Sequence, residues 1–101
     1  MNGECVDDYL APGQAGNAGL FPYPSLFRPN QLTPAKCIAK CQSPPNPQSF
    51  AGIQNGNECY CGSVAPPQER IVDIGECDID CNEDTSIKCG GSNRKMSVYT
   101  T

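Results

Sequence analysis

Cysteine is the residue type with the widest chemistry in this chain of 101 residues, which contains eight cysteines and no histidine. A cysteine can ligate a metal, act in redox or nucleophilic chemistry, or form a disulfide. The eight lie at Cys5, Cys37, Cys41, Cys59, Cys61, Cys77, Cys81 and Cys89. The spacing of the pairs 37/41 and 77/81 alone allows a zinc site with four cysteine ligands, but such a site would leave four thiols unexplained.

Catalytic roles for these cysteines lack the partners that they need. A thioredoxin-type redox site would show C-x-x-C, and a cysteine protease needs a histidine base; the sequence contains neither. An even number of cysteines in a short acidic chain, with ten glycines and ten prolines, favours four disulfides instead. We therefore predict an oxidising, extracellular location, no cofactor, no metal and no catalytic residue.

The charge of the chain limits its partners. The formal net charge is −4 and the pI is about 4.5, which argues against a nucleic-acid partner. The seven Lys and Arg residues are scattered, so we expect no membrane contact from this domain itself. No segment approaches the roughly 18 apolar residues of a membrane span, and Met1–Glu4 has no signal-peptide features. We interpret residues 1–101 as a single domain excised from a longer protein.

An acidic run invites a test for calcium and for glycoside hydrolysis. Asp78, Asp80, Asn82 and Asp84 alternate as in the first half of an EF-hand loop, but the required glycine is replaced by Glu83 and the final glutamate by a cysteine. Paired carboxylates could hydrolyse a glycosidic bond, yet these lie in a cysteine-tied loop with no evident cleft. A solvated acidic face and a non-enzymatic protein are the predictions.

Two elements position the central cysteines. Thr33 and Pro34 are typical of a helix start, which predicts a helix over about 34–42 with Cys37 and Cys41 on one face. Asn55-Gly56 between residues 48–54 and 57–61 predicts a hairpin with a two-residue turn.

In that hairpin Gly52 would lie opposite Cys59, and Phe50 opposite Cys61. Because Cys59 and Cys61 share one strand face, we predict that they pair with Cys37 and Cys41, in either of two ways. The other four cysteines leave three pairings open.

The remaining chain predicts short strands and long loops. Strands are expected at residues 4–10, at 71–74 and at 94–101, with Met96 and Val98 on one face of the last. Residues 11–32 are rich in Gly, Pro and aromatic residues and predict a long loop, a feature that often carries function.

The order of these anchors resembles one known family. The matching segments are Cys37-x3-Cys41, FAGIQ at 50–54, NECYCG at 57–62, Cys77-x3-Cys81 and CGGSNRKMSVY at 89–99, with Cys5 as the leading cysteine. The combination of E-C-x-C-G, C-G-G and S-V-Y resembles the WSC domain of fungal cell-wall stress sensors. The resemblance departs from the usual pattern in the length of the 11–32 segment and in an extra residue at Lys95.

The resemblance implies a fold and a function. The fold would be α+β and PAN/apple-like, with one helix stapled across a small curved antiparallel sheet. The function would be an extracellular, non-catalytic module that binds fungal cell-wall polysaccharide, β-glucan being expected, in a wall-stress sensor or a secreted wall-acting protein. The alternative is a protein–protein adhesion or self-association module of the apple type.

Sugar sites combine an aromatic face with amides and charged groups, which makes six residues candidates for ligand binding. They are Tyr23, Phe27, Arg28, Asn55, Asn57 and Tyr60. For each, a structural role is the competing interpretation: core packing for the aromatic residues, a left-handed turn for Asn55. Tyr60 should project from the hairpin face opposite to Cys59 and Cys61, beside Ala51 and Ile53. Tyr99 is expected to pack.

Overall fold

The computed structural model describes residues 1–7, 23–26, 32–92 and 94–101, with only the backbone of 23–26. In chain order the elements are β1 (Asn2–Asp7), β2 (Tyr23–Leu26), α1 (Pro34–Gln42), β3 (Phe50–Gln54), β4 (Glu58–Gly62), the short 3-10 helices η1 (Gln68–Arg70) and η2 (Ile74–Glu76), and β5 (Lys95–Thr100).

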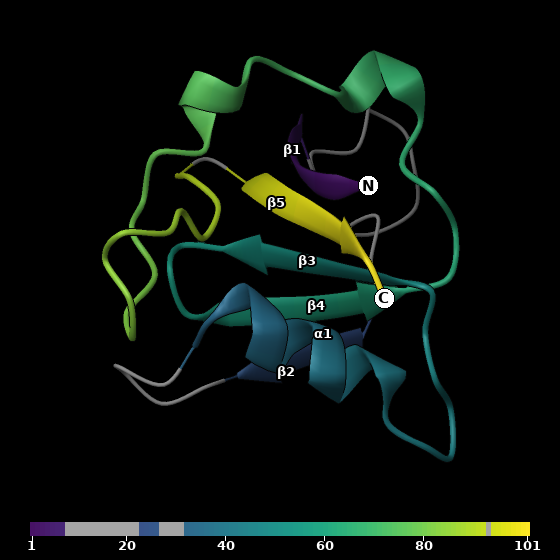
Figure 1. The fold of residues 1–101 in the computed structure, drawn as a ribbon. Helices are drawn as coiled ribbons and strands as arrows, with labels where there is room; N and C mark the ends of the chain where they lie inside the picture. Colours follow the sequence, from purple (N-terminus) through teal and green to yellow (C-terminus); the bar gives the residue numbers. More distant parts are fainter. Residues whose placement is uncertain (8–22, 27–31, 93) are drawn as a thin grey trace.

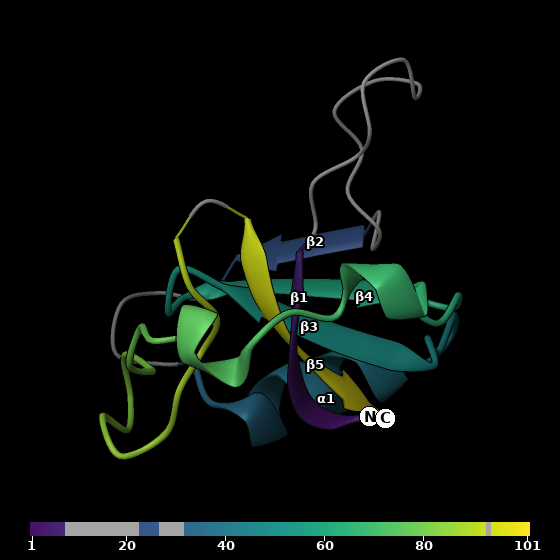
Figure 2. The ribbon, with the colours of Figure 1, turned by 90° about the horizontal axis from the view of Figure 1, so that it is seen from above.

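The strands form one antiparallel sheet in the order β1-β5-β3-β4-β2 (Figure 1). Helix α1 packs across one face, mainly over β3 and β4 (Figure 2). The predicted α+β fold, a small disulfide-rich sheet with a single stapled helix, is confirmed.

Helix α1 has the bounds and the cap that the sequence predicts. The Thr33 side chain accepts a hydrogen bond from the Lys36 amide at 3.3 Å, and Pro34 opens the first turn. At the other end the Ser43 amide donates to the Lys40 carbonyl at 3.2 Å. Cys37 and Cys41, one turn apart, are both buried against the sheet.

The sheet buries apolar side chains on both faces. Under α1 lies the larger cluster, which includes Leu32, Ala51 and Ile53 together with six cysteines. On the other face, Val6, Met96 and Val98 form a smaller cluster. Met96 and Val98 therefore share one face of β5, as predicted.

The disulfides are Cys5–Cys77, Cys37–Cys59, Cys41–Cys61 and Cys81–Cys89. The prediction that the hairpin cysteines bond to the helix is confirmed. Both bonds run in parallel from α1 to β4, so the helix is fixed to the sheet at two points one turn apart.

The predicted hairpin register is wrong by one residue. Asn55 and Gly56 adopt the positive φ values of an Asn-Gly turn, 55° and 81°, but pairing closes at Gln54 and Glu58, so Asn57 belongs to the loop. The Gly56 amide donates to the Cys89 carbonyl at 2.9 Å, which ties the turn to another segment.

A one-residue shift exchanges the two faces of a strand. Ile53 and Ala51 therefore lie opposite Cys59 and Cys61, beneath the helix. Gly52 pairs with Tyr60 on the other face.

Two other expectations need correction. The predicted loop 11–32 contains strand β2, whose Pro24 argues against a strand in the sequence but is tolerated because β2 is an edge strand. The predicted strand 71–74 is reduced to an isolated bridge between Ile71 and Val6, and Ile74 begins η2. Apart from β2 and the buried Leu32, residues 11–32 lie outside the described part of the chain.

Candidate functional site

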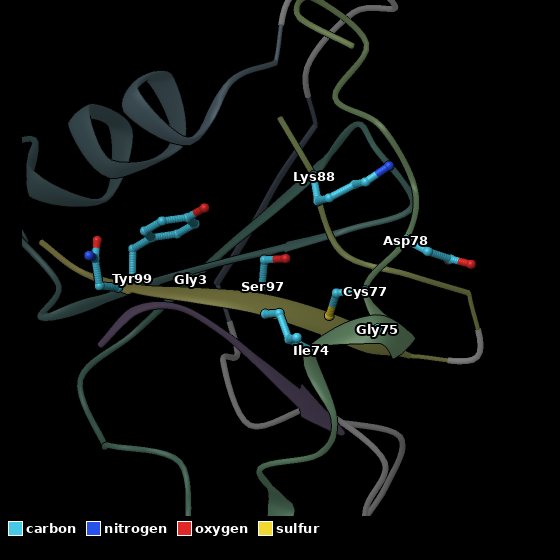
Figure 3. Close-up of a pocket in the computed structure, with 9 residues that line it drawn as sticks. Gly3, Ile74, Gly75, Cys77, Asp78, Lys88, Ser97 and Tyr99 are labelled. Atoms are coloured by element: carbon cyan, nitrogen blue, oxygen red, sulfur yellow. The ribbon is translucent and has the colours of Figure 1, made fainter. Parts of the chain in front are cut away.

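A pocket of about 300 Å³ opens on the helix-bearing face of the sheet, beside the part that α1 covers (Figure 3). This size is at the lower end of ligand pockets, roughly 300–1,000 Å³. We call it the Tyr99 pocket. Its lining residues come from β1, β5, η2 and the segment that follows η2: Asn2, Gly3, Ile74, Gly75, Cys77, Asp78, Lys88, Ser97 and Tyr99.

Tyr99 supplies the aromatic side chain of the pocket. Its ring lies over Gly3, where a bulge shifts the pairing of β1 with β5 and φ is +98°. A Cβ atom at Gly3 would lie 3.2 Å from the Tyr99 hydroxyl oxygen and 3.4 Å from the ring. Only glycine combines this backbone conformation with room for the ring.

The segment 71–78 forms the wall opposite the strand. It is held along β1 by the hydrogen bond from the Val72 amide to the Cys5 carbonyl, at 2.9 Å, and by the Cys5–Cys77 disulfide. Asp73 caps η2 by accepting from the Gly75 amide at 3.3 Å. These contacts present Ile74 at the pocket, where 62% of its surface is exposed.

Polar groups complete the lining. Figure 3 shows the Tyr99 ring at one end, Ser97 and Ile74 in the middle, and Lys88 and Asp78 at the far end. Ser97 is buried, and its hydroxyl oxygen accepts from the Gly90 amide at 2.9 Å. The Lys88 ammonium is 2.6 Å from a carboxylate oxygen of Asp80. An aromatic face beside hydroxyl, amide and charged groups is suited to a sugar.

A second hollow of about 310 Å³ shares two lining residues, Gly75 and Asp78, with the Tyr99 pocket. We call it the Glu76 hollow, because its other lining residues are Glu76, Ser92 and Lys95. Lys95 lies 3.9 Å from the Asp7 carboxylate.

The hairpin candidates lie away from this pocket. The Glu58 carboxylate accepts one hydrogen bond from the side-chain amide of Asn55 at 2.8 Å and another from the Tyr60 hydroxyl at 2.6 Å. Tyr60 packs against the Val6–Met96–Val98 cluster, on the face opposite to Cys59 as predicted, but beside Gly52. Asn57 is partly exposed in the turn. A ligand role for Asn55, Asn57 and Tyr60 stays a prediction.

The other three candidates lie within residues 11–32, a segment of which the structure describes little. The Tyr23 backbone belongs to β2 and pairs with Cys61, while its side chain is outside the description. Phe27 and Arg28 are outside the described residues. Their role in binding remains a prediction.

One possible metal cluster occurs among the described residues, and it consists of Cys37, Cys41 and Cys59, whose sulfur atoms lie within 4.8 Å of one another. All three sulfurs belong to disulfides, so they offer no thiolate to a metal. In the acidic run, Asp80 pairs with Lys88, and Asp84 accepts from the Ser86 hydroxyl and amide. Those two hydrogen bonds lower the pKa of the Asp84 carboxyl.

Comparison with known families decides the identity of the domain. The family model described as "WSC domain" matches residues 5–91. The chain belongs to the WSC domain family. The Drosophila melanogaster protein named Xylosyltransferase oxt is 35% identical over 69 residues, which cover 68% of this chain and 8% of that protein.

Two WSC domain-containing proteins of Arthroderma benhamiae are 35% identical over 75 residues and 30% identical over 102 residues. These matches cover 74% and 94% of this chain and 10% of each relative. This WSC domain thus spans about a tenth or less of the length of these relatives. In the described residues, no helix has the length and apolar character that a membrane span needs.

The structure explains the C-G-G motif of this WSC domain. Gly90 has a φ of +80°, and a Cβ there would lie 2.1 Å from the Ile53 carbonyl oxygen. A Cβ on Gly91 would lie 2.1 Å from the Glu76 carbonyl oxygen. The motif therefore lets the chain pass closely between β3 and η2, which brings η2 to the pocket.

Proposed function

We propose that this WSC domain is an extracellular, non-catalytic module that binds a neutral polysaccharide of the fungal cell wall, β-glucan being the expected polymer. In a longer protein it would serve as the head of a wall-stress sensor or as the targeting domain of a secreted wall-acting protein. The observation that carries the proposal is the Tyr99 pocket, where an aromatic ring and an exposed Ile74 lie beside polar groups. Family membership and four disulfides support a carbohydrate-binding module made for an oxidising compartment.

The charges around the site favour a neutral glycan. Both lysines at the two hollows have carboxylate partners, Lys88 with Asp80 and Lys95 with Asp7. Glu76 and Asp78 add two further carboxylates. An anionic polymer would meet a net negative surface here, whereas the hydroxyl groups of a neutral sugar can donate to these oxygens.

The same carboxylates support binding without catalysis. Glu76 and Asp78 are both exposed to solvent. A glycosidase needs one carboxyl group that stays protonated, which enzymes achieve by burying it in apolar surroundings. The site lacks that setting among the described residues, so we expect no hydrolysis of a bound glycan.

Co-sedimentation with insoluble β-1,3-glucan, chitin, cellulose and xylan tests the proposal. The oxidised domain should sediment selectively with β-1,3-glucan, and a reduced and alkylated sample should stay in solution. Selective binding to one of the other polymers would keep the module and correct the ligand. Failure to bind any polymer would refute the proposed function.

Self-association is the second candidate. Val64 and Ile71, outside the Tyr99 pocket, are exposed large apolar side chains, at 75% and 40%. Analytical ultracentrifugation over a range of concentrations would detect dimers. Association that soluble β-glucan does not compete away, and that Val64→Ser abolishes, would favour the adhesion module over the glycan-binding module.

A further inference from the structure

The two hollows lie in line along one strand. Tyr99, Ser97 and Lys95 alternate along β5, so their side chains point to the same face of the sheet. Tyr99 and Ser97 line the Tyr99 pocket, and Lys95 lines the Glu76 hollow. At a rise of roughly 3.3 Å per residue, the distance from Tyr99 to Lys95 is about 13 Å, which is longer than one hexose unit.

The hollows also adjoin each other. Gly75 and Asp78 line both, and Figure 3 places these two residues at the end of the Tyr99 pocket that is remote from Tyr99. The Glu76 hollow therefore begins where the Tyr99 pocket ends. Gly75 at the junction leaves it open, since the nearest atom to an added Cβ would be an Asp73 carboxylate oxygen at 3.9 Å.

The two ends offer different chemistry. At the Tyr99 pocket, the aromatic ring and Ile74 present apolar surface to the C–H face of a sugar. At the Glu76 hollow, the carboxylates of Glu76 and Asp78 can accept from sugar hydroxyl groups, and Ser92 and Lys95 can donate to them. A single monosaccharide cannot use both sets of groups.

We propose that the two hollows form one groove along β5, and that this groove binds an internal stretch of a linear neutral glycan, with one sugar stacked on Tyr99 and a sugar further along the chain, beyond the reach of a disaccharide, held by hydrogen bonds at Glu76 and Ser92. This inference rests on the proposed function, which requires only that the Tyr99 pocket binds a glycan. The groove adds a requirement for chain length: affinity rises when the ligand reaches the second hollow.

Titration calorimetry with soluble β-1,3-gluco-oligosaccharides, from the disaccharide to the hexasaccharide, tests the groove. A sample shown to be monomeric by analytical ultracentrifugation, titrated with these monovalent sugars, excludes avidity. Affinity should increase with length and then level off once both hollows are filled. The double variant Glu76→Gln/Ser92→Ala should lower hexasaccharide affinity about two- to tenfold, the effect of one or two lost hydrogen bonds, and leave disaccharide affinity unchanged.

Glu69→Gln is the matched control, since Glu69 is an exposed acid on η1 that lines neither hollow. It should bind every oligosaccharide as the unmodified domain does. Equal affinity for the disaccharide and the hexasaccharide would refute the groove and leave the proposed function intact. A length dependence that the double variant does not change would also refute it. If no oligosaccharide binds, the groove and the proposed β-glucan function both fail.

Discussion

At the scale of the residue, Tyr99 has the environment that a sugar platform needs. One side of its ring is supported by the Gly3 backbone, and it packs at the margin of the cluster under α1. Burial raises the pKa of the Tyr99 phenol above 10.0, and the Glu4 carboxylate adds to the shift. The hydroxyl therefore stays protonated at neutral and mildly acidic pH, where it can donate a hydrogen bond.

Substitution of Tyr99 separates its ring from its hydroxyl. Tyr99→Ala removes the stacking surface and should weaken glycan binding about two- to tenfold, whereas Tyr99→Phe keeps the ring and should lose less. Binding isotherms on soluble glucan would measure both. Because Tyr99 also packs in the fold, thermal unfolding must show that the Ala variant remains folded.

Ile74→Ala provides a second probe, since this side chain is exposed and its loss should not disturb folding. Normal binding by folded Tyr99→Ala and Ile74→Ala variants would argue that the glycan binds elsewhere.

The residues that sequence reasoning missed have a common reason. Strand alternation correctly places Tyr99 on the face opposite to Met96 and Val98, but it does not tell where on that face the helix ends. Because α1 packs mainly over β3 and β4, the β1–β5 part of the face stays open and Tyr99 lines a pocket there. Ile74, exposed on a short 3-10 turn, gives no periodic signal at all. Gly3, at the bulge in β1, is the one residue whose type indicates that an aromatic ring, here that of Tyr99, packs on the backbone.

At the scale of the element, the sequence predicts correctly those features that depend only on residues close together in the chain. The Thr33–Pro34 start and the face shared by Cys37 and Cys41 are properties of a few neighbouring residues, and they are confirmed. The predicted hairpin register is wrong because the turn is shaped by a contact with a distant residue: the Gly56 amide donates a hydrogen bond to the Cys89 carbonyl. Strand β2 was missed because Pro24 is compatible with a strand only at an edge, and the edge is defined by the assembled sheet.

The 89–91 segment passes close to β3 and η2, so its two glycines are needed to keep these elements in their places. Gly90→Ala would place a methyl group against the Ile53 carbonyl in a backbone region that disfavours side chains, so we expect it to cost at least about 2 kcal/mol of unfolding free energy. Gly75→Ala is the control, because its Cβ would make only an ordinary contact, 3.9 Å from an Asp73 carboxylate oxygen, and the change should stay within about 0.5 kcal/mol. Guanidinium titrations of the oxidised proteins measure both. Equal stability of the two variants would contradict the close passage.

At the scale of the whole molecule, the buried core consists largely of disulfide-bonded cysteines. Eight of the fourteen buried apolar side chains in the described part are cysteines. The bond from Cys5 to Cys77 spans 72 positions, whereas the bond from Cys81 to Cys89 spans 8. By loop-closure entropy, these bonds should contribute about 4 and about 2.5 kcal/mol respectively.

Two double variants test this difference and its link to the site. Cys5→Ala/Cys77→Ala should lower the unfolding free energy more than Cys81→Ala/Cys89→Ala, and it should also weaken glycan binding, because the wall of the Tyr99 pocket loses its anchor. Denaturant titrations and calorimetry on the folded fraction give the two readings. The opposite order of stabilities would show that strain or residual structure outweighs loop length.

If the proposed groove binds a wall polymer, strand β5 has a mechanical consequence. It carries the groove residues on one face, it is hydrogen-bonded to β1 on one side and β3 on the other, and it leads to the C-terminal end (Figure 1). A pull between a gripped polymer and that end would run along the strand axis. This pull would load the hydrogen bonds from β5 to β1 and to β3 in shear, so that many of them resist it together. A pull that peels the strand away would instead break them one after another. The same strand would then both carry the polymer-binding residues and transmit the load.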